Sequence, residues 1–164
     1  MKAKDITLGG IVVALSIVTL YFTNILPANT LALLGIASCF IPVVIMRSNI
    51  KTAIFVYLST TIISFFLIPI NYVLMYGMFF GIYGIVKYFI EKLNKMPLEI
   101  ALKLVFFNIM LLLGIFVMNS FLGNLQIDIP MWTLFIAAQA IFLVYDYALT
   151  GIISFYLNRF HKLI

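Results

Sequence analysis

Residues 98–122 read LEIALKLVFFNIMLLLGIFVMNSFL, and Glu99 and Lys103 are the only charged residues among them. A bilayer has a hydrocarbon core about 30 Å thick, and a helix of about 20 apolar residues crosses it. The run Leu111-Leu112-Leu113 does not alternate apolar with polar residues, as the strands of a membrane β-barrel do. The stretch therefore predicts a transmembrane helix.

The composition of the whole chain agrees with this prediction. Of the 164 residues, 65% are hydrophobic and 9% are charged, whereas an ordinary soluble domain is about 45–50% apolar and about 25% charged. So few ions cannot cover so much apolar surface in water. The composition excludes a cytosolic enzyme, a nucleic-acid-binding domain and a disordered regulator. The single cysteine, Cys39, permits no intramolecular disulfide.

Five further apolar runs accompany the first one. The six predicted spans are residues 6–26, 31–46, 52–68, 70–90, 98–122 and 131–157. The apolar run after Lys4 is longer than the apolar region of a typical signal peptide, so we expect a retained span there. The sequence predicts an all-α membrane protein with six transmembrane helices in a single domain over residues 1–164.

The basic residues predict the orientation of these spans. Six spans place both termini on one side, together with the second–third and fourth–fifth loops. Nine of the ten basic residues lie on that side: Lys2, Lys4, Arg47, Lys51, Lys87, Lys92, Lys95, Arg159 and Lys162. The loops of the other side carry only Asp128. By the positive-inside rule, we expect a multi-pass protein of the cell membrane with both termini in the cytoplasm.

Polar residues inside the spans are expected to face protein. Trp132, Gln139 and Asp146 recur every seven residues and share one stripe of the last span. A carboxylate at mid-membrane costs about 2.5–3.5 kcal/mol on insertion scales. Asp146 is therefore interpreted either as a proton or substrate contact or as a structural hydrogen bond between helices. Asn108 is a second buried polar candidate.

The tenth basic residue, Lys103, lies in the fifth span. On an ideal helix it is about 140° from the stripe of Asn108 and Asn119. We therefore expect it to be a poor partner for Asp146 and to extend toward the cytoplasmic headgroups.

The fourth span carries two adjacent stripes. Gly77, Gly81 and Gly84 form a small-residue seam that predicts close approach of another helix. Tyr72, Tyr76 and Tyr83 form an aromatic stripe. We favour an aromatic belt at the membrane interface for these tyrosines over a stacking wall for a flat ligand.

Hydrogen-bonding and aromatic side chains gather at the outer ends of the spans and in the outer turns. The predicted substrate-binding residues are Asn24, Asn29, Asn71, Tyr72, Tyr76, Asn119, Asp128, Trp132 and Gln139. The set contains no Arg or Lys, which a phosphate or a carboxylate would require. It suits an uncharged or weakly cationic heterocycle.

Several kinds of chemistry are missing from the sequence. It has no Gly-rich phosphate loop and no cluster of Cys and His with the spacing of a metal site. The only histidine, His161, lies in the tail. No histidine base is therefore available to serines such as Ser16, Ser38, Ser59, Ser64 and Ser120. We expect no enzymatic activity, no cofactor, no metal and no nucleic-acid partner.

The start of the chain suggests a family. The basic segment Lys2-Ala3-Lys4-Asp5-Ile6-Thr7 leads into a first span with the small pair of Gly10-Ile11-Val12-Val13-Ala14. With six spans in so short a chain, this layout resembles the substrate-binding S component of an energy-coupling factor (ECF) vitamin transporter. The family pattern is Ala-xxx-Ala, and Gly10 replaces the first alanine.

The resemblance implies partners and a mechanism. Gly10 and Ala14 would contact a transmembrane coupling subunit, and two cytoplasmic ATPases would drive transport. A small-molecule substrate would bind near the external face, and the subunit would topple in the membrane to release it inside. Two alternatives stay open: a non-transporting scaffold similar to a rod-shape-determining protein, and a small self-contained carrier.

Overall fold

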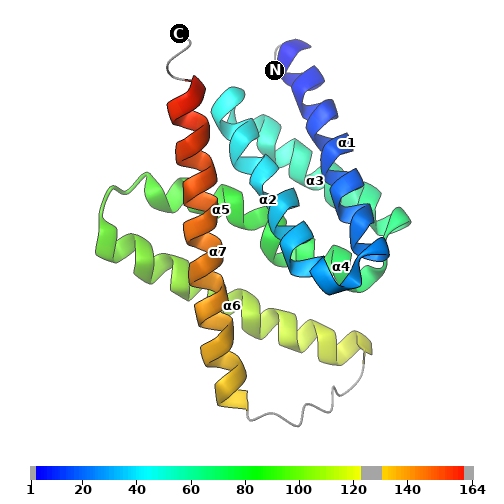
Figure 1. Ribbon diagram of the computed structural model, residues 1–164, viewed down its shortest axis with the longest axis vertical. Helices are drawn as coiled ribbons and strands as arrows, with labels where there is room; N and C mark the ends of the chain where they lie inside the picture. The colour runs from blue at the N-terminus through cyan, green and yellow to red at the C-terminus, as the bar shows by residue number, and fades with distance from the viewer. Residues whose placement is uncertain (1–2, 123–130, 161–164) are drawn as a thin grey trace. The chain divides into compact units, whose positions relative to one another are not determined.

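The computed structural model describes residues 3–122 and 131–160, and every regular element in these ranges is a helix (Figure 1). The elements are α1 (Ala3–Ile25), η1 (Pro27–Asn29), α2 (Thr30–Arg47), α3 (Ile50–Leu67), α4 (Ile70–Met75), η2 (Tyr76–Phe80), α5 (Gly81–Glu91), α6 (Met96–Leu122) and α7 (Met131–Phe160). Because α4, η2 and α5 are consecutive, they form one long helix over residues 70–91.

The predicted all-α membrane fold is confirmed. Six of the described helices are long and apolar enough to cross a membrane, and each overlaps one predicted span. The turn after the first span contains the short helix η1, which begins at Pro27, and Pro69 precedes the first residue of α4. The chain is therefore a multi-pass membrane protein.

The chain divides into two compact units, Met1–Lys95 and Met96–Ile164, called here the first unit and the second unit. The first unit contains α1 to α5 and the second contains α6 and α7. The expectation of a single six-helix domain over residues 1–164 stays a prediction.

The glycine seam of the fourth span is confirmed in the first unit. A Cβ atom on Gly77 would lie 3.1 Å from the methyl group of Thr61 on α3. On Gly81 it would lie 2.7 Å from a ring carbon of Tyr57, also on α3. On Gly84 it would lie 2.9 Å from Cδ of Pro42 on α2. The small residues let this helix approach α2 and α3 more closely than any larger side chain would allow.

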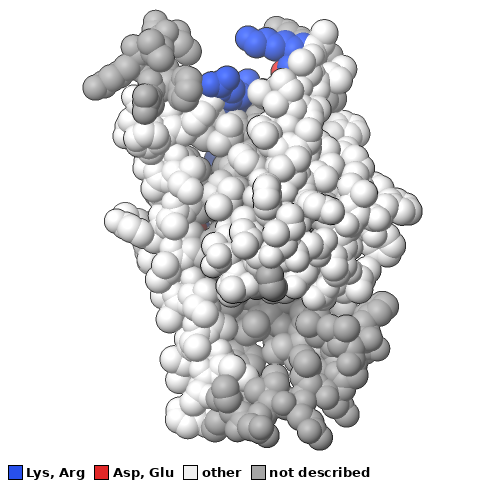
Figure 2. All heavy atoms as spheres, turned by 45° about the vertical axis from the view of Figure 1, so that its right-hand side comes forward, with Lys and Arg blue, Asp and Glu red and all other residues white. Residues whose placement is uncertain are grey.

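Polar groups tie α1 to the start of α3. The Asn49 side chain caps α3 by accepting a hydrogen bond from the backbone N–H of Thr52 at 2.9 Å. The neighbouring Ser48 hydroxyl donates to Oδ1 of Asp5 on α1 at 2.7 Å. Figure 2 shows Lys and Arg atoms where α1 begins and an almost uncharged surface over the rest of the visible face of the first unit. On this face, the charges of the unit thus gather near the start of α1.

In the second unit, α6 and α7 cross one another (Figure 1). The rings of Phe107 and Phe142 stack at this crossing, with centroids 4.4 Å apart and planes 9° from parallel. Both rings are buried. This stacked pair is the apolar centre of the contact between the two helices.

Candidate functional site

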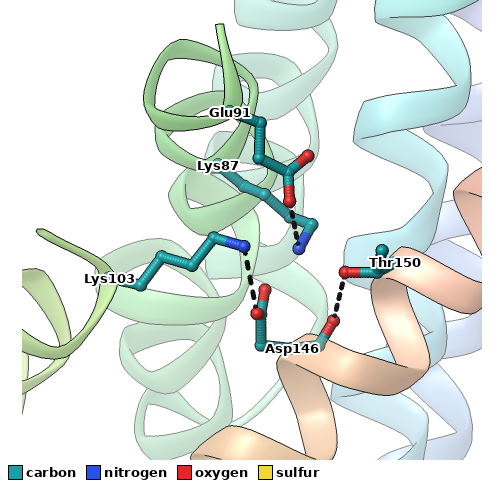
Figure 3. Close-up of polar contacts among 5 residues, drawn as sticks. All are labelled: Lys87, Glu91, Lys103, Asp146 and Thr150. Carbon is teal, nitrogen blue, oxygen red and sulfur yellow. Dashed lines mark hydrogen bonds and ion pairs between the residues drawn. The ribbon is translucent and has the colours of Figure 1, made fainter. Parts of the chain in front are cut away.

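An ion pair joins the two helices of the second unit. Nζ of Lys103 on α6 lies 3.0 Å from Oδ2 of Asp146 on α7 (Figure 3). The side chains are 9% and 18% exposed, respectively. Ionised groups at this depth are costly unless they pair with an opposite charge. The structure therefore supplies each of these ions with a counter-ion inside a membrane-spanning segment.

The prediction that Lys103 extends toward the headgroups instead of pairing with Asp146 is wrong. That prediction took the stripe of Asn108 as the only face of α6 that meets α7. The contact is centred on Phe107, which on an ideal helix is about 40° from Lys103 and about 100° from Asn108. The four-carbon stem of Lys103 is long enough to span its 40° offset from Phe107. Lys103 and Asn108 therefore reach α7 from opposite sides of Phe107.

A second polar contact lies at the same crossing. Nε2 of Gln139 donates to Oδ1 of Asn108 at 2.7 Å. Nδ2 of Asn108 donates to the backbone oxygen of Leu104 at 2.8 Å. Gln139 and Asp146 therefore both meet α6, as their shared stripe predicts. A structural contact between helices is present at Asp146, and its role as a proton or substrate contact stays a prediction.

The predicted substrate-binding residues fall into two groups. In the first unit, Asn24 and Asn29 are exposed, Asn71 and Tyr72 are half-buried, and Tyr76 is fully buried. In the second unit, Trp132 is 68% exposed and Gln139 contacts Asn108. The side chain of Asn119 and all of Asp128 lie outside the described residues. The joint role of this set in binding a substrate stays a prediction.

The interpretation of the tyrosine stripe as an aromatic belt is wrong for two of its members. Tyr76 and Tyr83 are both 0% exposed, whereas belt residues face the lipid headgroups. The Tyr83 ring stacks on Phe79 with a centroid separation of 5.7 Å. The stripe is therefore directed into the protein at these positions.

A π-helical turn, η2, coincides with the first of the buried tyrosines. The backbone N–H of Gly81 bonds to the carbonyl of Tyr76, five residues earlier. The Tyr57 hydroxyl on α3 donates to the carbonyl of Gly77 at 2.7 Å. Sequence analysis missed this feature, and π-helical turns occur frequently at functional sites.

The predicted docking residues lie on an open face of α1. A Cβ atom on Gly10 would meet nothing within 4 Å, and Ala14 is exposed. Gly9 instead faces α3, where its Cβ would lie 3.5 Å from Thr52 and from Val56. A groove of about 460 Å³ runs between α1 and α3; the residues that line it include Ile6, Gly9, Gly10, Val13, Phe55, Ser59 and Ile63.

A further ion pair was not anticipated. Nζ of Lys87 lies 2.8 Å from Oε1 of Glu91, one turn later on α5 (Figure 3). The Lys87 side chain is 1% exposed. The signal in the sequence that could have predicted this pair is the spacing of four residues between opposite charges.

The predicted absence of a metal site is untested, although no cluster of three or more potential metal-ligating side chains occurs in the described part of the chain.

Comparison with protein-family models, with curated proteins and with solved structures found no match for this chain.

Proposed function

We propose that this chain is the membrane-embedded substrate-binding subunit of an ECF-type importer for a vitamin or a related small heterocycle. The observation that carries the proposal is the open small-residue face of α1, where the space next to Gly10 is empty. Small residues allow the backbone of a neighbouring transmembrane helix to come close. The chain has no phosphate-binding loop, so a separate pair of ATPases would supply the energy for transport.

The groove between α1 and α3 gives this docking face a second wall. Gly9 and Gly10 line it on α1, and Phe55 and Ile63 line it on α3. A helix of the coupling subunit that enters here would pack against both α1 and α3. Such a contact relies on van der Waals packing, because lipid is as apolar as the groove itself.

Two substitutions test the docking face. We expect Gly10→Leu and Ala14→Leu to abolish co-purification of the coupling subunit and both ATPases with the tagged chain, because each adds a large side chain where a helix must approach. Leu15→Phe is the control, since Leu15 is 49% exposed on α1 and on an ideal helix lies about 140° from Gly10 and about 100° from Ala14. The measurement is quantitative proteomics of the purified complex. Wild-type amounts of both ATPases with the two leucine variants would contradict the proposed face.

The proposal includes an orientation in the cell membrane, with both termini in the cytoplasm. It is supported by the charges of the sequence, because the turn at Ala28 carries no ion whereas the turn before α3 is flanked by Arg47 and Lys51. In a Cys39→Ser background, Ala28→Cys should react with a membrane-impermeant maleimide on intact cells. Lys51→Cys should react only after permeabilisation. The reverse pattern would show that the orientation is inverted.

A further inference from the structure

The buried side chains of the first unit are apolar at one end of the helices and include hydroxyl residues further along. One end is apolar and consists of Val12, Ile41, Val44, Ile45, Ala53, Val56 and Ile85. Further along α1 and α3, the buried positions are Ser16, Thr60 and Ser64, and η2 adds Tyr76. All four of these residues are 0% exposed. A membrane protein therefore buries a group of hydroxyls where further apolar side chains would be expected.

These four hydroxyl oxygens have no hydrogen-bond partner among the described residues. Serine and threonine in helices ordinarily donate to a backbone carbonyl of the preceding turn. In this chain Thr61 does so, to the carbonyl of Tyr57 at 2.9 Å, as does Thr19, to Leu15 at 2.8 Å. Thr60 and Ser64 do not. A buried hydroxyl without a partner costs free energy, so these two side chains depart from the pattern of their neighbours at a cost.

Two of the hydroxyls, those of Thr60 and Tyr76, lie at the contact between α3 and η2. Thr60 and Ser64 share one face of α3, being four residues apart, and Thr60 is the hydroxyl residue next to Tyr76. The two elements are in close contact, because a Cβ on Gly81 would meet both Tyr57 and Tyr76, at 2.7 and 3.1 Å. The Thr60 and Tyr76 side chains lie close enough to interact, but their oxygens do not meet the distance and angle of a hydrogen bond.

The backbone at this place is also irregular. The π-helical turn begins at Tyr76 itself, and a carbonyl within it, that of Gly77, accepts the Tyr57 hydroxyl. Departures from the α-helical ladder occur at π-bulges and where a side chain or a water molecule inserts. The irregular turn therefore lies beside the hydroxyls that lack partners.

We propose that the first unit holds at least one bound water molecule between α3 and η2, hydrogen-bonded by the hydroxyls of Thr60, Ser64 and Tyr76. Three hydroxyls supply both donors and acceptors, and a buried water makes about three such bonds. The three hydroxyls are uncharged hydrogen-bonding groups, so the site suits a neutral hydrogen-bonding ligand. The inference does not rest on the proposed transport function.

X-ray radiolytic footprinting of the wild-type protein in detergent tests this proposal, because hydroxyl radicals formed from bound water oxidise the residues around it. Tyr83 is the matched control: it is as fully buried as Tyr76 and lies seven residues later. We expect Tyr76 to be oxidised several-fold faster than Tyr83, and Thr60→Val to slow the oxidation of Tyr76. Equal slow rates at the two tyrosines would overturn the proposal.

A second measurement separates a hydrated site from a dry one. If water bridges the hydroxyls, Tyr76→Phe removes a hydrogen bond, and the midpoint of thermal unfolding should fall by about 2–4 °C. If the site is dry, the substitution removes an unpaired buried hydroxyl. The midpoint would then stay the same or rise, and the water site would be refuted.

Discussion

Replacing Gly81 with alanine is expected to destabilise the first unit by about 2–3 kcal/mol, the upper part of the range for overpacked cores. The added Cβ would lie 2.7 and 2.8 Å from two ring carbons of Tyr57. The ring cannot easily move away, because its hydroxyl is held by the carbonyl of Gly77 at 2.7 Å. Thermal unfolding of the purified protein in detergent measures the effect.

Gly10→Ala is the matched control for this prediction. The substitution and the helical context are the same, but the new Cβ atom meets nothing within 4 Å. Alanine is favoured over glycine in a helix by about 1 kcal/mol, so Gly10→Ala should be neutral or slightly stabilising. In a Tyr57→Phe background the ring is released, and Gly81→Ala should then cost less. Equal effects of Gly81→Ala and Gly10→Ala would show that the seam is not closely packed.

Breaking the Lys103–Asp146 pair is the second substitution with a large expected effect. Lys103→Met leaves the Asp146 carboxylate without its lysine partner inside a membrane-spanning helix. Removing one member of a buried pair typically costs about 3–5 kcal/mol, because the remaining charge stays desolvated. We therefore expect Lys103→Met to lower the stability of the second unit strongly, as measured by unfolding in mixed detergent micelles.

The double variant separates the loss of a pair from the loss of packing. Lys103→Met with Asp146→Leu removes both charges, and replacing a buried pair by apolar residues is often neutral or stabilising. It should therefore be clearly more stable than Lys103→Met alone. The exposed Lys51 provides the control, since Lys51→Met changes the same residue type at the surface. If Lys103→Met costs no more than Lys51→Met, the ion pair contributes nothing to the second unit.

The six spans could be predicted because lipid imposes a strong constraint: each crossing needs a long apolar helix with its backbone hydrogen bonds satisfied internally. The seam of Gly77, Gly81 and Gly84 could be predicted from the sequence as well, since only small residues allow helices to come this close. Both features follow from one-dimensional patterns in the sequence. Neither depends on the rotation of one helix against another.

The predictions were wrong where the contacts of a side chain depend on how its helix is rotated about its own axis. The stripe of Tyr76 and Tyr83 has no marker that distinguishes a lipid-facing side from a protein-facing side. The partner of Lys103 depends on which face of α6 meets α7. The stack of Phe107 on Phe142 fixes this face, and no periodic pattern in the sequence indicates that these two rings meet. The π-helical turn at Tyr76 arises from tertiary contacts, including the hydrogen bond from Tyr57. Long-range contacts of this kind cannot be derived from a single sequence.

Native mass spectrometry of the protein released from detergent micelles tests the proposal that this chain binds a small molecule for uptake. We expect a discrete bound mass in the range of a small heterocycle. Its occupancy should fall in Trp132→Ala, at a predicted binding residue, and persist in Gly10→Leu, at the docking face. A protein that carries only lipid, with the same spectrum for both variants and the wild type, would contradict the proposed function.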